Sequence, residues 1–263
     1  MYYLSPISPD QVTAGIWSLF DPSKPTMPRA FNVLEGVNRG QILVDDPVYP
    51  TLAVVREAMY GTFYFGGAVN ISLMNVLVDE FRRLGDVGIG CWPDDPINEM
   101  IPYAPEYDGK TLYFTQRSRV GDENESPLPD GYALVMRDLQ LLRQSPDYQS
   151  TLDAFGTEEN ILQHTLGVMV LYGGNVVCEA ATGAPTHGRI EVGVTTDPSH
   201  RQRGLASIAC RRLIRMCEER GLETWWDCAK QNTPSVRLAN KLGYQNGREY
   251  RYMLWTHKHE TES

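Results

Sequence analysis

Residues Arg189–Ala206 read RIEVGVTTDPSHRQRGLA, an apolar β-branched run followed by a polar loop and a glycine. The run Arg189–Thr196 predicts a strand that stops at Asp197–Pro198. A helix is expected to begin at Gly204 or one residue earlier, and its first turn would present free N–H groups at the positive end of the helix dipole. Because Gly204 has no Cβ and Ala206 carries only a methyl, the stretch predicts a pyrophosphate site at this turn.

The segments around this loop have the pattern of an α/β domain. Gly173–Gly174–Asn175 predicts a hairpin turn between two apolar strands, and the hairpin precedes a strand–helix–strand–helix–strand run. We therefore predict a mixed central sheet, splayed open near its middle and flanked by helices. The expected strands are Tyr132–Met136, Leu166–Tyr172, Val176–Thr182, Arg189–Thr196, Thr224–Cys228 and Arg248–Trp255, and the expected helices are Asp147–Phe155, Thr157–His164, Gly204–Arg220 and Thr233–Leu242.

The first half of the chain contains a strand–helix–strand pattern, which indicates a separate α/β domain. Its strands are expected over Tyr60–Phe65 and Asp86–Trp92, with a helix over Ile71–Leu84 that buries Leu73, Val76, Leu77, Phe81 and Leu84. Met1–Val48 is rich in proline and without a strong period, so we expect it to be mostly irregular. The polar, acidic stretch Arg117–Asp130 predicts a linker or a long surface loop between two halves, and the domains are placed at residues 1–126 and 127–263.

A second motif follows the predicted glycine loop. Trp225–Tyr244 reads WWDCAKQNTPSVRLANKLGY, in which Asn232 is a good N-cap and Gly243 a good helix end. With RQRGLA, this stretch resembles the GNAT superfamily of acetyl-CoA-dependent N-acetyltransferases. Together with LPDGY at Leu128–Tyr132, it is similar to a two-domain branch that includes zwittermicin-resistance-type acetyltransferases.

The resemblance implies acetyl-CoA as the cofactor and assigns its contacts by position. The loop would hold the pyrophosphate, the end of the preceding strand the pantetheine arm, and the next helix a further part of the cofactor. These contacts fall on Arg201, Gln202, Arg203, Gly204, Leu205 and Ala206 in the loop, on Val194, Thr195 and Thr196 in the strand, and on Asn232 and Ser235 in the helix.

The catalytic residues are harder to identify. Glu191 is a charged residue inside an apolar strand, and it is the candidate general base, with Glu179 as the runner-up and a buried ion pair or an edge position as the alternative. Many relatives have a tyrosine general acid where this chain has Ala239, which leaves Tyr244 as a weak candidate or a core residue. Cys228 has no nearby histidine in the sequence, so direct transfer without an acyl-enzyme is expected.

Composition limits the partners. The formal net charge is −9, which argues against nucleic acid and suits a cationic small-molecule amine. The odd count of five cysteines without a CxxC pair argues against disulfides and metal sites, and no apolar run predicts a membrane span, so a cytoplasmic protein is expected.

Several alternatives stay open. A catalytically silent acyl-CoA-binding module that recognises a protein partner is the alternative function, and transfer of a longer acyl group is a third. The oligomeric state is not readable, a homodimer included. An aromatic set could line a substrate cleft or simply pack in the core: Trp92, Tyr103, Tyr107, Tyr113 and Phe114.

Overall fold

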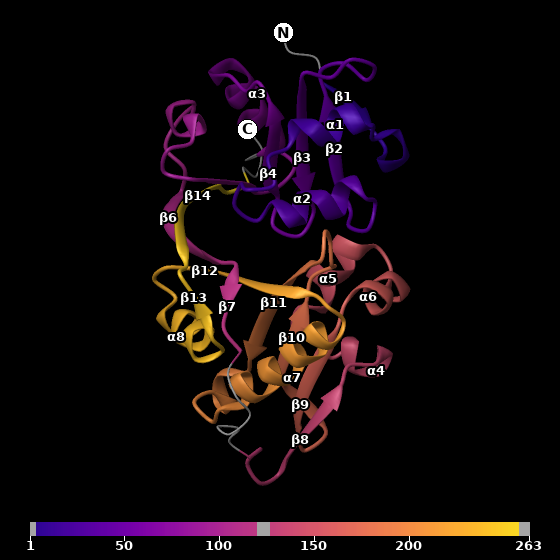
Figure 1. Ribbon diagram of the computed structural model, residues 1–263, viewed down its shortest axis with the longest axis vertical. Coiled ribbons are helices and arrows are strands. Elements are labelled where there is room, and N and C mark those ends of the chain that lie inside the picture. The colour runs from indigo at the N-terminus through magenta and orange to yellow at the C-terminus, as the bar shows by residue number, and fades with distance from the viewer. Residues whose placement is uncertain (1–3, 120–126, 258–263) are drawn as a thin grey trace, which may run out of the picture. The chain divides into compact units, whose positions relative to one another are not determined.

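The computed structural model describes residues 4–119 and 127–257 (Figure 1). The chain divides into two compact units, residues 1–111 with 249–263 and residues 112–248. The division differs from the predicted boundary at residue 126 because β14 (Arg248–Trp255) pairs with β5 (Val87–Cys91) and so returns to the first unit. Part of the predicted linker, residues 120–126, lies outside the described residues.

The first unit is built on a mixed sheet with the strand order β1-β2-β3-β4-β5-β14-β6. Its remaining strands are β1 (Ser5–Ile7), β2 (Gly40–Val44), β3 (Leu52–Glu57), β4 (Thr62–Gly67) and the first part of β6 (Tyr107–Phe114), whose residues from Leu112 on belong to the second unit. Its helices are α1 (Ala14–Leu19), α2 (Met27–Leu34) and α3 (Ile71–Phe81), with 3₁₀ turns η1 (Pro9–Gln11) and η2 (Pro96–Glu99).

The strand–helix–strand prediction is confirmed in this unit. Strands β4 and β5 pair in parallel and α3 connects them. The helix ends at Phe81, one turn earlier than predicted, and its buried stripe is narrower. Val76 and Leu84 were expected in the core, but they are 36% and 71% exposed.

The expectation that Met1–Val48 is mostly irregular is wrong. This segment contains β1, α1, α2 and β2, and seven of the eight residues of α2 are buried. Pro28 lies in the first turn of α2, where its missing N–H removes no helical hydrogen bond. The elements are short, so their periodicity is weak in the sequence even though they form a core.

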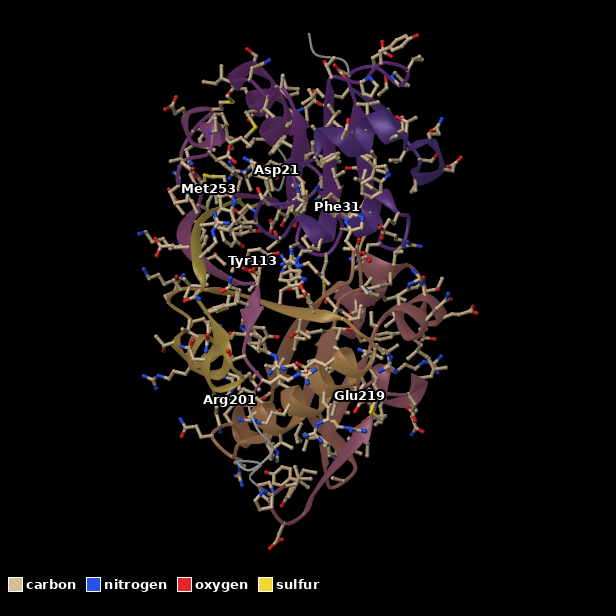
Figure 2. The ribbon with its side chains drawn as sticks, in the orientation of Figure 1. Asp21, Phe31, Tyr113, Arg201, Glu219 and Met253 are labelled. Carbon is tan, nitrogen blue, oxygen red and sulfur yellow. The ribbon has the colours of Figure 1, made fainter. Side chains whose placement is uncertain are left out.

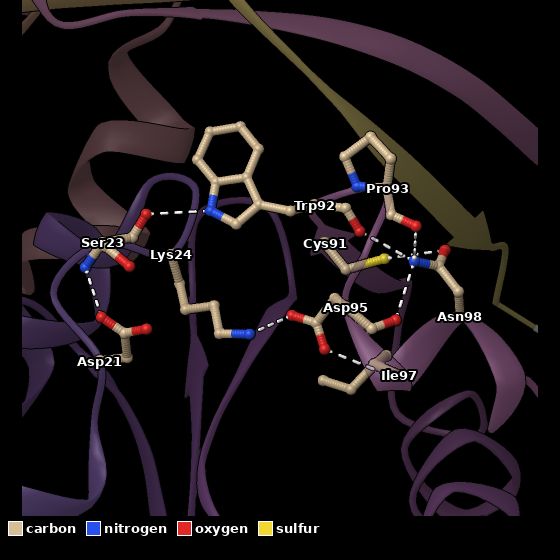
Figure 3. Close-up of polar contacts among 9 residues, drawn as sticks. All are labelled: Asp21, Ser23, Lys24, Cys91, Trp92, Pro93, Asp95, Ile97 and Asn98. Carbon is tan, nitrogen blue, oxygen red and sulfur yellow. Dashed lines mark hydrogen bonds and ion pairs between the residues drawn. The ribbon is translucent and has the colours of Figure 1, made fainter.

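A polar network joins the segment after α1 to the end of β5 (Figure 3). The indole Nε1 of Trp92 donates to the carbonyl of Ser23 at 3.0 Å, and Lys24 forms an ion pair with Asp95. The amide of Asn98 donates to the carbonyls of Trp92 at 2.8 Å and Asp95 at 3.0 Å. Trp92, a candidate for a cleft wall, is therefore held inside this unit as a structural residue.

The second unit has the strand order β12-β11-β10-β9-β8. The first four strands along the chain are antiparallel neighbours, whereas β11 and β12 run parallel, so the predicted mixed sheet is confirmed. These strands are β8 (Tyr132–Met136), β9 (Gly167–Tyr172), β10 (Asn175–Thr182), β11 (Arg189–Thr196) and β12 (Glu223–Ala229). A two-stranded sheet pairs β13 (Tyr244–Gln245) with β7 (Gln116–Arg117).

Helices connect these strands, and all of them except α4 were predicted. They are α4 (Leu139–Leu142), α5 (Tyr148–Phe155), α6 (Glu158–His164), α7 (Leu205–Glu219) and α8 (Thr233–Lys241), with a 3₁₀ turn η4 (Pro198–His200) before α7. None of the helices in the described part of the chain has the length and apolar character needed to cross a membrane.

Helix α7 supplies most of the helical contribution to the core of this unit. It buries Leu205, Ala209 and Leu213 in one cluster with Val168, Cys178 and Val192 of the sheet. Alternate residues of a strand point to opposite faces. The face of β11 that carries Val192 and Val194 therefore packs against α7, and Glu191 and Thr195 lie on the other face.

Replacing Leu213 by alanine tests this core. Leu213 is fully buried, so the loss of its side chain should lower the free energy of unfolding by about 2–5 kcal/mol. The exposed neighbour Arg212 provides the control, because Arg212→Ala should change it by no more than about 0.5 kcal/mol. Urea denaturation of both variants measures the difference, and equal effects would contradict the packing described.

Candidate functional site

Strands β11 and β12 part after a short stretch of pairing. They are in register over only three pairs, Arg189 with Glu223, Ile190 with Thr224 and Glu191 with Trp225. Beyond Glu191, β11 continues with β10 alone, up to Thr196. The sheet is therefore splayed between these two parallel strands, as predicted.

The hydrogen bonds of β10 show which groups of β11 face the splay. The amide of Gly183 donates to the carbonyl of Glu191 at 3.2 Å, and that of Asp197 donates to the carbonyl of Val177 at 2.9 Å. In an antiparallel ladder, every second residue bonds to one neighbour and the residues between them face the other way. Val194 and Thr196 therefore turn their main-chain N–H and C=O groups away from β10, toward the splay.

Thr195 differs from its two neighbours in the predicted pantetheine strand. It lies opposite Glu179 in the ladder with β10, so its main-chain groups face that strand. Its hydroxyl donates to Asp147, just before α5, at 2.9 Å. Of the three residues predicted for this contact, the ladder thus gives Val194 and Thr196 the required orientation and gives Thr195 a structural role.

The loop after β11 ends at an uncapped helix. Gly204 is the N-cap of α7, with a φ of 82° and no side-chain hydrogen bond to the first turn. Ile208 is the first residue whose N–H bonds back, to Gly204 at 3.1 Å, so the N–H groups of Leu205, Ala206 and Ser207 have no acceptor within the helix. Among the described residues, and apart from its neighbours in the chain and the backbone of α7, no atom lies within 4 Å of where a Gly204 Cβ would be. Glycine is needed here for its backbone conformation, and the space beside it is open.

Two arginines precede Gly204 in this loop. Arg201, Gln202 and Arg203 are all exposed, and Gln202 adopts a φ of 60°. The guanidinium of Arg201, labelled in Figure 2, donates through Nε to the carbonyl of Thr196 at 3.1 Å. Arg201 therefore ties the loop to the end of β11 and keeps its charge at the surface.

The two residues predicted on the next helix have local partners. Asn232 caps α8 by accepting from the N–H of Ser235 at 3.3 Å, and the Ser235 hydroxyl accepts from Trp226 Nε1 at 3.1 Å. Asn232 is exposed at the surface, whereas Ser235 is half-buried. The capping role is present, and a contact with a cofactor stays a prediction for both residues.

Glu191 lies with several polar and aromatic residues on the sheet face opposite α7. It is half-buried at the last β11–β12 pair, and Asp227 lies two residues beyond its partner Trp225, on the same face. The ring of Tyr113 packs edge-on against Trp225, with centroids 5.3 Å apart, and its hydroxyl accepts from Arg189 at 3.1 Å. We did not predict Arg189 and Asp227, although their alternation with Glu191 and Trp225 is visible in the sequence.

The charges of the neighbouring side chains affect the pKa of the Tyr113 phenol. Burial raises its pKa, Arg189 opposes the rise, and the carboxylates of Glu191 and Asp227 add to it. Tyr113 is 4% exposed, so it stays protonated at neutral pH and faces two acidic side chains.

The runner-up base, Glu179, is held in an ion pair inside the protein. Its carboxylate pairs with the buried Arg137 guanidinium at 3.0 Å, and both side chains are less than 5% exposed. The Arg137 guanidinium also donates to Thr165. The second oxygen of Glu179 has no hydrogen-bond partner in the described part of the chain, but it is closed to solvent. Glu179 therefore forms a buried ion pair, whereas the buried ion pair or edge position that we considered as an alternative concerned Glu191.

Tyr244 also belongs to the core. It is 1% exposed, and its hydroxyl donates to Thr224 at 2.9 Å. Burial raises its pKa well above the usual value. Its ring packs near Trp226 and Phe114 on the α7 side of the sheet. We therefore assign Tyr244 to packing, and Ala239, fully buried on α8, offers no acid in its place.

Comparison with known proteins identifies related sequences and folds. The sequence model of the family described as GNAT acetyltransferase matches residues 19–253. An uncharacterized N-acetyltransferase of Bacillus subtilis (strain 168), YdfB, is 29% identical over 158 residues, which are 59% of this chain. The match spans 57% of the length of that relative.

Two solved structures share the fold across nearly their full length. A GCN5-related N-acetyltransferase-like protein from Streptococcus suis has a TM-score of 0.68 at 23% identity and covers 91% of this chain and 96% of its own. A tandem GNAT protein from the clavulanic acid biosynthesis pathway has a TM-score of 0.61 at 9% identity, with 98% and 99% covered.

The five cysteines are all free and buried. Burial raises the pKa of Cys178 to about 11 and the pKa values of Cys91 and Cys217 to about 12, and it also raises those of Cys210 and Cys228. A nucleophilic cysteine needs a lowered pKa. Among the described residues, no three His, Cys, Asp or Glu side chains converge in a way that could hold a metal ion.

Thiol labelling tests this description of the cysteines. At a pKa of about 11, roughly one Cys178 thiol in a thousand is the reactive thiolate at pH 8. Iodoacetamide should therefore label Cys178, and likewise Cys91 and Cys217, at least ~100-fold more slowly in the folded protein than in the unfolded one. Mass spectrometry counts the labels, and all five thiols should react in guanidinium. Rapid labelling of Cys228 in the folded protein would contradict its assignment to packing.

Proposed function

Because this chain belongs to the GNAT acetyltransferase family, we propose that it transfers the acetyl group of acetyl-CoA directly to an amine of a small molecule. The observation that carries the proposal is the splay between β11 and β12, which leads along the open edge of β11 to the uncapped start of α7. The main chain along this edge can thus form hydrogen bonds with both parts of the cofactor, its extended pantetheine arm and its pyrophosphate.

The residues present fit acetyl-CoA. The N–H groups of Leu205, Ala206 and Ser207 lack acceptors within α7, and the space beside Gly204 is open, as an approaching pyrophosphate requires. Arg201 and Arg203 add positive charge beside it. Val194 and Thr196 would hold the pantetheine arm through their main chain, with Asn232 and Ser235 on the far side of the splay.

The residues that would carry out the reaction lie where the pairing of β11 with β12 ends, at Glu191. When bound, acetyl-CoA supplies a thioester whose acetyl group moves to the amine nitrogen with release of the thiol. Because the Val194 N–H faces the splay, it would stabilise negative charge on the carbonyl oxygen. The amine must lose a proton to attack, and Glu191 is the carboxylate at the last β11–β12 pair, so it accepts that proton directly or through water.

The sheet face opposite α7, which carries Glu191, suits a cationic amine substrate. Glu191 and Asp227 both lie opposite α7, and Arg189 donates to Tyr113 beside them. Glu191 and Asp227 bring two carboxylates to this face beside the Arg189 guanidinium, and the chain as a whole has a formal net charge of −9. A protonated amine would be attracted to this face and would reach the splay from the side away from α7.

Cofactor binding at the helix start is tested by a matched pair of glycines. Gly204 and Gly221 flank α7, both have positive φ, and both have open space at the Cβ position. Asparagine tolerates this conformation better than other residues do, so both substitutions should preserve the fold. Gly204→Asn should weaken CoA binding at least ~10-fold by calorimetry, because its side chain fills the approach to the helix N–H groups.

Gly221→Asn is the control, since the C-terminal end of α7 has no part in the proposed site. It should bind CoA as the wild type does, with a similar small fall in Tm to that of Gly204→Asn. Equal CoA affinity in the two variants would place the pyrophosphate elsewhere.

The role of Glu191 is tested by Glu191→Gln. Loss of the general base should lower kcat by about 10²-fold or more while CoA binding is kept. The readout is thiol release from acetyl-CoA with a panel of primary amines, and Glu219→Gln, an exposed carboxylate at the C-terminal end of α7, should leave the rate unchanged. Tight CoA binding without thiol release on any amine would instead support a catalytically silent module.

A further inference from the structure

Three aromatic side chains gather beside the loop that precedes α7. Tyr132 and Tyr172 have ring centroids 4.8 Å apart, and His200 lies 5.7 Å from Tyr132 and 5.2 Å from Tyr172. The hydroxyl of Tyr132 is hydrogen-bonded to Nδ1 of His200 at 2.8 Å. We call these three residues the aromatic cluster.

The fold places the aromatic cluster at one end of the sheet. Tyr132 and Tyr172 are directly opposite each other in the β8–β9 ladder. His200 ends the η4 turn, where its N–H donates to the carbonyl of Asp197 at 2.9 Å. It directly precedes Arg201, so the cluster is continuous with the proposed pyrophosphate loop.

The aromatic cluster is not a closed core. Tyr172 is 48% exposed, and Tyr132 and His200 are half-buried. Glu191 lies five residues before Thr196 on β11, a separation of about 17 Å at the rise of a strand. The cluster follows the far end of this strand, so it lies away from the acceptor amine and close to where the nucleotide half of the cofactor would leave the loop.

We propose that the aromatic cluster binds the adenine ring of CoA by stacking, chiefly on Tyr172. The inference rests on the proposed function, because it takes the pyrophosphate to lie at the start of α7. Adenine is joined to that pyrophosphate through one ribose, and its flat π-face matches the exposed phenol ring. The Tyr132–His200 hydrogen bond holds the rings behind Tyr172 in place, and the exposed Arg201 and Arg203 suit the phosphate on the ribose.

The experiment measures binding by calorimetry, with CoA, 3′,5′-ADP and 4′-phosphopantetheine as probes. Tyr172→Ala should weaken CoA and 3′,5′-ADP roughly five-fold to a hundred-fold, the range for loss of one base–aromatic stack. It should leave 4′-phosphopantetheine unchanged, since that probe has no adenine. Tyr172→Phe keeps the ring and should bind all three probes as the wild type does, and Tyr49→Ala, at an exposed tyrosine of the first unit, is the control.

The outcomes separate the two proposals. If Tyr172→Ala binds CoA as tightly as the wild type, or loses affinity equally for CoA and 4′-phosphopantetheine, the adenine assignment is overturned while CoA binding stands. If the wild-type protein fails to bind CoA at all, the proposed function itself is overturned, and the adenine assignment with it.

Discussion

The pairing of β11 with β12 ends after three residue pairs, and the proposed site depends on that early end. A strand inside a sheet normally has neighbours on both sides, which consume all its main-chain groups. Beyond Glu191, β11 keeps a partner only on the β10 side. Val194 therefore presents its main-chain N–H and C=O groups to the splay, and Thr196 presents its N–H, while the Thr196 carbonyl accepts from Arg201. An extended, amide-containing ligand can complete this row of hydrogen bonds.

Both faces of the sheet hold β11 in this position. On one face, Val192 packs with α7, and the same helix places its uncapped start at the end of the strand. On the other, Thr195 bonds to Asp147 and the neighbouring strand carries the buried Arg137–Glu179 pair. Breaking such a pair is costly, because it leaves an uncompensated buried charge. The open edge is thus supported by residues that do not touch the ligand.

The sequence was sufficient for the mixed sheet and the family, since long periodic strands and α7 follow one another with distinct loop signals. It was insufficient for Met1–Val48, whose elements are too short for a clear period, and for the domain boundary, because the pairing of β14 with β5 is non-local. The main-chain groups of Thr195 face β10 whereas those of Val194 face the splay, and this difference could be seen only from the register of β11 with β10. The proximity of Tyr113 to Glu191 could not be predicted either, because the two residues lie on strands that are distant in the sequence.

Amide hydrogen exchange with and without CoA tests the central claim most directly, because it reports on the main-chain groups themselves. The account predicts slower exchange on CoA binding for the amides of Val194, Thr196, Leu205, Ala206 and Ser207, with little change at Thr195, which already faces β10. Protection that spares both the open edge of β11 and the first turn of α7, while appearing elsewhere in the chain, would contradict it.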